Sequence, residues 1–141
     1  MPAACVFCEI VSGKLPAHRV FEGKEVVAFL DARPLFQGHV LVVPVQHSDT
    51  LLDLKPAGLE PLFTVVQKVA RAVETGLQAD GSFVAINNRV SQSVPHLHVH
   101  VVPRSRGDGL RGFFWPRRRY ADAAEQARVA AAIRGELERA A

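Results

Sequence analysis

Residues 94–104 read VPHLHVHVVPR and contain three of the chain's six histidines, His96, His98 and His100. Alternate residues of a β-strand point to the same face of a sheet. A strand here would therefore present the three imidazoles together, with neighbouring Cα atoms about 6.5–7 Å apart. The aliphatic residues between and after them would face the core and anchor the strand. These residues are Leu97, Val99 and Val101.

Three interpretations of these histidines differ in the chemistry that they assign. The histidines could be unrelated polar residues on a solvated face, ligands of one catalytic metal, or a nucleophile with supporting groups. Strict alternation with bulky aliphatics argues against the first. A flat strand separates the outer two Cα atoms by roughly 13 Å, which argues against one shared metal.

The composition describes a globular chain of 141 residues, about half of them apolar, with a formal net charge of +3. This is the size of one ordinary domain. There is no uncharged apolar run long enough to span a membrane, and MPAACVFCEI does not resemble a signal peptide. We therefore expect a cytoplasmic location without membrane contact. Two cysteines there suit thiols or metal ligands rather than a disulfide framework.

The histidine strand must be positioned by other elements, and the sequence predicts several. CVFCEIVSG predicts a short helix or loop that ends at Gly13. The segments RVFEG, EVVAFLD, HVLVVP, FVAIN and HLHVHVVP predict five strands. Pro34 and Gly38 mark the loop ARPLFQG between the second and third of these strands.

Two helices are predicted in addition. Apolar residues recur at steps of three and four over about 56–76, and Pro56 fits near the first turn. Asp122 and Glu125 predict a capping box for a C-terminal helix. The apolar face of that helix would consist of Val129, Ile133 and Leu137. The fold class expected is α+β, an antiparallel sheet of about five strands with one long and one C-terminal helix.

HLHVHVV resembles the signature of the histidine triad (HIT) family of nucleotide hydrolases and transferases. QSVPHLHVHVVPR, LDARPLFQGHVLVVP and CVFCEIVSGKLPAHRVFE also resemble HIT segments, in the family's order. The resemblance implies a HIT-like fold in one domain over 1–141, with a core of about 5–104 and a tail and helix over 105–141.

The resemblance implies that His98 attacks the α-phosphorus of a nucleotide derivative and forms a nucleotidyl-histidine, which water or another acceptor then resolves. Its second ring nitrogen should donate to a backbone carbonyl, which fixes the tautomer. His100 resembles the histidine that contacts the phosphate. Ser93 and Gln92 match residues that contact the phosphate or leaving group. The implied substrates are phosphoramidates, adenylates or dinucleoside polyphosphates.

The nucleoside end of the implied site lies in the N-terminal half. Asp31 resembles the residue that accepts hydrogen bonds from the ribose hydroxyls, as a carboxylate can. His39 matches a histidine that supports the active-site strand. The base pocket resembles that of a purine nucleotide site, with adenosine as the expected base; plain core packing is the alternative, above all for Phe29. Its residues are Phe7, Ile10, Phe29 and Leu30.

One loop departs from the family pattern. Many HIT proteins carry a loop of the type NNG-x-x-AGQ, whereas NNRVSQ here is two residues shorter and has Arg89 and Ser91 in place of glycines. We expect this loop to take a different path. Asn87 would occupy the family's polar position, or Asn87 and Asn88 would be ordinary turn residues.

Cys5-x-x-Cys8 is a weak motif by itself, compatible with a redox pair or two plain thiols. Some bacterial HIT proteins and the related galactose-1-phosphate uridylyltransferases have a similar pair with two histidines. The matching positions here are His47 and His96, which gives the four ligands of a structural Zn²⁺. No organic cofactor is expected.

Partners are predicted less directly. HIT proteins of this size are commonly homodimers, and the apolar segment Gly112–Trp115 would either reach a partner's site or form a seam within one chain. The basic residues at 104, 106, 111 and 117–119 would be a solvated loop or would attract an anionic ligand such as a nucleotide. They are too few to predict nucleic acid binding. A nucleotide-binding sensor or scaffold with incidental turnover is the alternative to an enzyme.

Overall fold

The computed structural model describes residues 4–110 and 117–140, in two compact units divided between Asp108 and Gly109. The predicted segment Gly112–Trp115 lies outside the described residues. The first unit holds the sheet and two helices, and the second holds the C-terminal helix. Whether both units form one domain, as expected from the resemblance, stays a prediction.

The sheet has five antiparallel strands in the order β1-β2-β3-β5-β4, which confirms the predicted α+β class. The bounds of the five strands are β1 Arg19–Glu22, β2 Val26–Leu30, β3 Val40–Pro44, β4 Gly81–Ala85 and β5 Val99–Arg104. The central strands β2, β3 and β5 are almost completely buried, because helices cover both faces. A strand covered on both faces needs apolar residues throughout, as VVAFL and VLVVP show.

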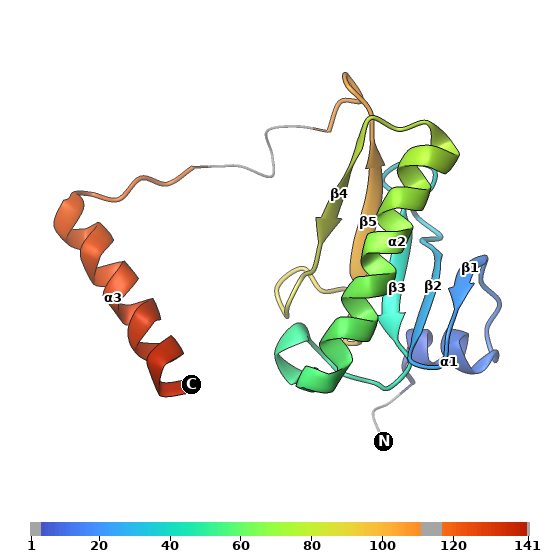
Figure 1. Cartoon of the computed structure of the whole chain (residues 1–141), viewed down its shortest axis with the longest axis horizontal. Helices are drawn as coiled ribbons and strands as arrows, with labels where there is room; N and C mark the ends of the chain where they lie inside the picture. Colours follow the sequence, from blue (N-terminus) through green and yellow to red (C-terminus); the bar gives the residue numbers. More distant parts are fainter. Residues whose placement is uncertain (1–3, 111–116, 141) are drawn as a thin grey trace. The chain divides into compact units, whose positions relative to one another are not determined.

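The long helix α2, Leu59–Leu77, crosses one face of the sheet (Figure 1). It begins three residues later than expected, because Pro56–Gly58 forms a separate 3₁₀ turn, η2, after the short 3₁₀ helix η1, Leu51–Asp53. Buried residues of α2 pack against alternate residues of the three central strands and of the segment just before β5. Among them are Leu97, Val99 and Val101, as predicted. These aliphatics therefore fix the histidine segment from behind.

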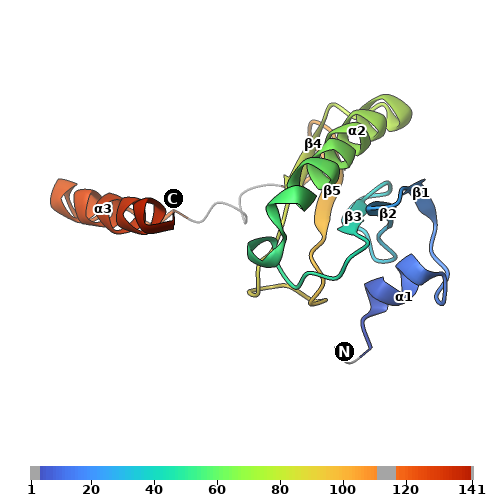
Figure 2. The same ribbon diagram turned by 60° about the horizontal axis from the view of Figure 1, so that its bottom comes forward.

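The short helix α1, Val6–Ser12, covers the opposite face of the sheet from α2 (Figure 2). Gly13 ends it with a φ of +88°, as predicted. Phe7 and Ile10 pack on the other alternate set of strand residues, among them Phe29 and Leu41. The register pairs Leu41 with His100, so the histidines share the α1 face.

Strand β5 begins at Val99, three residues later than the HLHVHVVP segment suggested. Its partner β3 ends at Pro44, and the N–H of Leu97 instead donates to the carbonyl of Ser48 at 2.7 Å. Strand β4 similarly covers 81–85 rather than 83–87. His96 and His98 therefore lie in an extended segment just before the ladder, with their alternation preserved.

The second unit contains α3, Ala123–Ala140. The side chain of Asp122 accepts from the N–H of Glu125 at 2.8 Å, and the Glu125 carboxylate accepts from the N–H of Ala121. This arrangement confirms the predicted start of the helix. None of its residues is buried, and the apolar face of Val129, Ile133 and Leu137 is exposed.

Candidate active site and metal centre

His98 is held with one defined nitrogen free for chemistry. Its side chain is buried, and its Nδ1 lies 2.7 Å from the carbonyl oxygen of His96. Because a carbonyl can only accept, Nδ1 carries the proton and donates. The Nε2 of the neutral ring therefore keeps its lone pair, which is the requirement for a nucleophile. The hydrogen bond expected from the sequence is present.

A relay of hydrogen bonds sets the tautomer of His100. The N–H of Leu35 donates to Nδ1 of His39 at 3.1 Å, so the proton of the neutral His39 ring lies on Nε2. That Nε2 is 3.0 Å from Nδ1 of His100, which must accept. His100 consequently carries its own proton on Nε2. The relay turns His100 into a hydrogen-bond donor beside His98, with the two ring centroids 4.9 Å apart.

Burial favours the neutral form of the His39 and His100 rings. Burial lowers the pKa of His39 below its usual value. Burial, with the neighbouring His98 and His39 as smaller contributions, lowers the pKa of His100 to about 4. Neutral imidazoles have one donor and one acceptor nitrogen each, which is the state that the relay requires.

A cavity of about 630 Å³ with mainly apolar walls is lined by His39 and Phe7, whereas His98 and His100 are not among its lining residues. Seven of the residues predicted for nucleotide binding or catalysis line it, namely Phe7, Ile10, Phe29, Leu30, Asp31, His39 and Ser93. The Phe7 ring stands edge-on to His98, with 5.0 Å between centroids. This size and lining suit a small ligand with one flat apolar part. The Asp31 carboxylate is the one acidic group in the lining.

Glycine at position 38 is required for this wall of the cavity. Gly38 has a φ of +96°, and a Cβ there would lie 2.2 Å from Cδ1 of Leu77 in α2. A side chain at 38 would therefore displace the Leu77 side chain, and the positive φ just before His39 favours glycine in any case.

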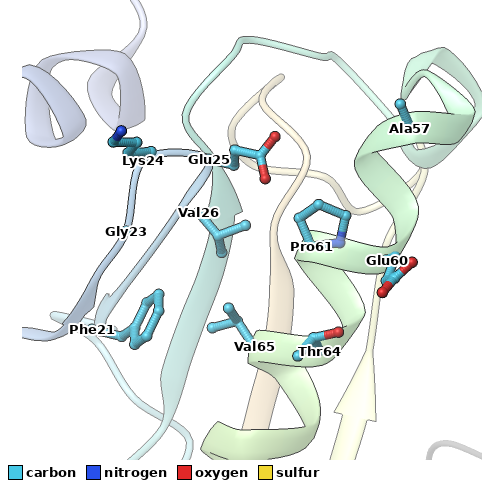
Figure 3. A pocket seen from close by; sticks show the side chains of 10 residues that line it. All are labelled: Phe21, Gly23, Lys24, Glu25, Val26, Ala57, Glu60, Pro61, Thr64 and Val65. Carbon is cyan, nitrogen blue, oxygen red and sulfur yellow. The ribbon is translucent and has the colours of Figure 1, made fainter.

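The cavity shown in Figure 3 is separate from these histidines. It has a volume of about 600 Å³ and lies between the β1–β2 turn and the first turns of α2. Lys24, Glu25 and Glu60 are the charged residues in its lining, and no histidine is among them. We assign no role to it.

The loop of residues 88–92 takes a conformation that normally favours glycine, although it has none. Arg89 and Ser91 have φ values of +70° and +62°. The Gln92 amide bridges the loop: its Oε1 accepts from the N–H of Arg89 at 2.8 Å, and its Nε2 donates to the carbonyl of Asp49 at 2.6 Å. Gln92 therefore holds the loop in place. The resemblance predicted only a contact between Gln92 and the phosphate or leaving group, not this structural role.

The two asparagines before this loop differ in environment. Asn88 Oδ1 accepts from the N–H of Leu51 at 3.0 Å and ties the loop to η1. Asn87 is exposed, and neither it nor Gln92 lines the cavity beside the histidines. The place of Asn87 in the nucleotide site stays a prediction.

Cys5, Cys8, His47 and His96 converge at the N-terminus of α1, with one ligand atom from each within 4.8 Å of the others. The Nδ1 of His96 lies 3.4 Å from Cys5 Sγ and 3.5 Å from Cys8 Sγ, and the Nδ1 of His47 lies 3.3 Å from Cys8 Sγ. A tetrahedral zinc site requires sulfur–nitrogen separations of about 3.6 Å. The donor set and its spacing therefore fit Zn²⁺.

The orientation of the two imidazole rings is consistent with the same conclusion. The Nε2 of His96 donates to the Pro44 carbonyl at 2.9 Å, and the Nε2 of His47 donates to the Asp49 carboxylate at 2.7 Å. Both Nδ1 atoms are then acceptors that face the cysteine sulfurs, His47 towards Cys8 and His96 towards both cysteines. These lone pairs are the ones that would bind a cation held by all four residues. The Pro44 carbonyl and the Asp49 carboxylate accept hydrogen bonds from the Nε2 atoms. Metal-bound histidines almost always have such a partner on the nitrogen that does not bind the metal.

The ionisation of the residues in this group reflects their burial. Burial, followed by the hydrogen bond and charge of Cys5, raises the pKa of the Cys8 thiol to about 11. Burial lowers the pKa of His96 to about 4, so its ring is neutral, as a ligand must be. Asp49 was missed at the sequence level, although its position two residues after a candidate histidine ligand was a usable signal.

A second group, Asp31, His39 and His100, has the residue types of a metal site. The relay argues against that use. Because Nδ1 of His39 accepts from a backbone N–H, its Nε2 carries a proton and offers no lone pair to a metal. We interpret the group as a hydrogen-bonding cluster.

The basic stretch is divided in the structure. Arg104, at the end of β5, forms a bidentate ion pair with Asp108. Its Nε lies 2.6 Å from Oδ2 and its Nη2 lies 2.9 Å from Oδ1. This arginine closes a turn. Residues 117–119 are exposed in the second unit.

The fold and site define a class of small α+β proteins with alternating histidines in and just before one strand of the sheet. The sequence profile of the HIT domain matches residues 12–107. An uncharacterized HIT-like protein of Mycobacterium tuberculosis is 41% identical over 108 residues, which cover 75% of each chain. The chain belongs to the HIT family, which confirms the resemblance.

Solved structures agree. A Zn-bound histidine triad family protein from Mycobacterium smegmatis is 41% identical, with 98% of each chain covered and a TM-score of 0.73. A protein from Streptococcus mutans is 33% identical, with a TM-score of 0.88 over 97% of this chain and 87% of that one. The HIT fold is therefore shown.

Two relatives have names that describe an activity. An asymmetrical bis(5'-nucleosyl)-tetraphosphatase of Schizosaccharomyces pombe is 37% identical over 77% of this chain and 59% of its own. An adenosine 5'-monophosphoramidase of Candida albicans is 30% identical over 81% of this chain and 79% of its own. The family thus includes hydrolases of nucleotides. None of the helices within 4–110 and 117–140 is long and apolar enough to cross a membrane.

Proposed function

We propose that this protein is a nucleotide hydrolase or nucleotidyl transferase that acts at an α-phosphate through a covalent intermediate on His98. The observation that carries the proposal is the hydrogen bond from Nδ1 of His98 to the His96 carbonyl, which leaves Nε2 as the nucleophile. The adjoining cavity of about 630 Å³ supplies a place for the nucleoside.

In the first step, the Nε2 lone pair of His98 attacks the α-phosphorus. A phosphorus–nitrogen bond forms while the bond to the leaving group breaks, and the leaving group departs with the electron pair and takes a proton from solvent. In the second step, the oxygen of water or another acceptor bonds to phosphorus while the phosphorus–nitrogen bond breaks, the electron pair returns to Nε2, and the acceptor's proton passes to solvent. The monophosphate or its transfer product is then released. Splitting the reaction in this way is nucleophilic catalysis.

Other residues bind and orient the substrate in this proposal. The Nε2–H of His100 donates to a nonbridging phosphate oxygen, where charge develops in the transition state. Ser93 contacts the phosphate or leaving group, with Gln92 holding its loop. Asp31 accepts from the ribose hydroxyls, and the apolar wall around Phe7 receives a purine, with adenosine the expected base.

Zn²⁺ is proposed as a structural ion bound by Cys5, Cys8, His47 and His96. When bound, it would join the start of α1 to the segment that follows β3 and the segment that precedes β5, without taking part in the reaction. The zinc-bound mycobacterial relative supports this assignment. A homodimer in the cytoplasm, with no nucleic acid partner, completes the proposal.

Turnover of a nucleotide panel tests the proposal. Adenosine phosphoramidate, an aminoacyl-adenylate and a dinucleoside tetraphosphate would be assayed for monophosphate release, with His98→Ala as the comparison. We expect turnover of at least one compound by the natural chain, none by His98→Ala, and nucleotide binding by both. Equal turnover by both would refute the role of His98. Binding without turnover in the natural chain would favour a nucleotide sensor.

A further inference from the structure

Asp49 contacts a residue of the metal centre through its side chain and a residue of the 88–92 loop through its backbone. Its carboxylate accepts from Nε2 of His47, whose Nδ1 faces Cys8 in the metal centre. Its backbone carbonyl accepts from Nε2 of Gln92, whose Oε1 holds the N–H of Arg89. One residue thus connects the metal centre to the 88–92 loop.

The loop depends on such external contacts. Arg89 and Ser91 occupy the left-handed region, which costs an L-residue stability unless the surroundings hold it there. Among the side-chain contacts of the described residues, Gln92 and Asn88 supply those that hold the loop, on Asp49 and Leu51 respectively. Both anchor points lie in the segment that follows His47.

The loop also leads directly to a proposed site residue. Ser93, next to Gln92, lines the nucleotide cavity and a second cavity of about 380 Å³. Cys5, His47 and Asp49 line that second cavity as well. The metal centre and the wall that carries Ser93 are therefore neighbours, with Asp49 between them.

We propose that Asp49 is a positioning residue that couples metal binding to the conformation of the 88–92 loop, and thereby sets the place of Ser93 at the nucleotide cavity. The proposal rests on the proposed function only for the role of Ser93. With Zn²⁺ bound, His47 is fixed, its Nε2 holds the Asp49 carboxylate, and the Asp49 carbonyl stays in place for Gln92. Without it, His47 is free to turn and the loop loses its anchor.

Hydrogen exchange measured by mass spectrometry tests the first half of this coupling. The natural chain with Zn²⁺, the same chain after chelation, and Zn²⁺-bound Asp49→Ala would be compared over residues 88–92, with zinc content measured in each. We expect exchange to become about tenfold faster on chelation and in Asp49→Ala, as for the loss of one hydrogen bond. Glu138→Ala, which removes an exposed acid from α3, should leave exchange unchanged.

Zinc affinity tests the reverse direction, because coupling between two sites is reciprocal. Gln92→Glu keeps an acceptor for the N–H of Arg89 but cannot donate to the Asp49 carbonyl, and it replaces no metal ligand. We expect it to weaken Zn²⁺ binding about fivefold in competition with a coloured chelator. Gln67→Glu, an exposed position on α2, is the control for the added charge and should bind as the natural chain does.

Unchanged loop exchange on chelation and in Asp49→Ala, or unchanged zinc affinity in Gln92→Glu, would overturn the coupling. Neither measurement uses a nucleotide. Failure of the His98 mechanism would therefore leave both results standing, and failure of the coupling would leave turnover at His98 intact.

Discussion

Replacing Arg89 with glycine should stabilise the protein, against the usual effect of introducing glycine. Arg89 is exposed and has a φ of +70°. Relief of the left-handed conformation is worth about 1–2 kcal/mol, whereas the extra chain entropy of glycine costs about 0.5–1 kcal/mol. The difference predicts that Arg89→Gly raises the free energy of unfolding by about 0.5–1 kcal/mol.

Urea unfolding at neutral pH with Zn²⁺ present measures this difference. For a slope of about 2 kcal/mol per molar, the midpoint of Arg89→Gly should rise by roughly 0.3–0.5 M. Arg89→Ala removes the charge but keeps the strain, so its midpoint should stay near that of the natural chain. This control matters because the pKa of Asp53 is lowered first by its hydrogen bond with Thr50 and, less strongly, by the charge of Arg89.

A second comparison makes the test specific to backbone conformation. Val90 is 80% exposed and does not have a positive φ, so Val90→Gly should lower the midpoint. If Arg89→Gly destabilises the protein as much as Val90→Gly does, the strain argument for the 88–92 loop is refuted.

Three further predictions concern the core, the histidines and the metal. Leu97→Ala, at a completely buried position, should lower the free energy of unfolding by about 2–5 kcal/mol in urea. Leu52→Ala, at 65% exposure, should change it by about 0.5 kcal/mol or less. Equal losses in the two variants would contradict the packing. The pKa of His100 is lowered to about 4 in the folded chain, so the unfolded chain binds more protons between its ordinary value of 6.5 and about 4. Stability should therefore fall as the pH falls through this range, and His100→Gln should show a shallower fall in urea midpoint; an identical slope would exclude His100 as a cause. Cys8→Ser should lose stoichiometric zinc by elemental analysis and unfold at a lower temperature, and chelation should not lower that temperature further; a zinc content of one per chain in Cys8→Ser would rule out Cys8 as a ligand.

The sequence was sufficient for features that depend on local pattern. The alternation of His96, Leu97 and His98 predicted that Leu97 faces the core and that the two imidazoles share the opposite face, because a strand has a period of two. The steps of three and four likewise predicted a helix with one buried apolar face, which α2 is, although Leu59, Phe63 and Leu77 of the predicted face are exposed. These patterns are visible in one segment of chain.

Features that depend on contacts between distant segments were not predicted. The relay from Leu35 through His39 to His100 joins residues up to 65 positions apart, and no local pattern encodes it. The tie between Asp49 and Gln92 is of the same kind. The loss of glycines in the loop predicted a changed path, which stays a prediction, but it did not predict that side-chain anchors hold the loop with Arg89 and Ser91 at positive φ.

Identification of the residue that becomes covalently modified tests the central claim most directly. The chain would be mixed with an adenosine phosphoramidate, quenched in alkaline denaturant to preserve a phosphorus–nitrogen bond, digested with trypsin and analysed by tandem mass spectrometry. Cleavage after Arg89 and Arg104 would release residues 90–104, which contain all three histidines of the strand. We predict a nucleotidyl group on His98 and none in His98→Ala. A nucleotidyl group on His96 or His100, or turnover without any modified histidine, would contradict the account.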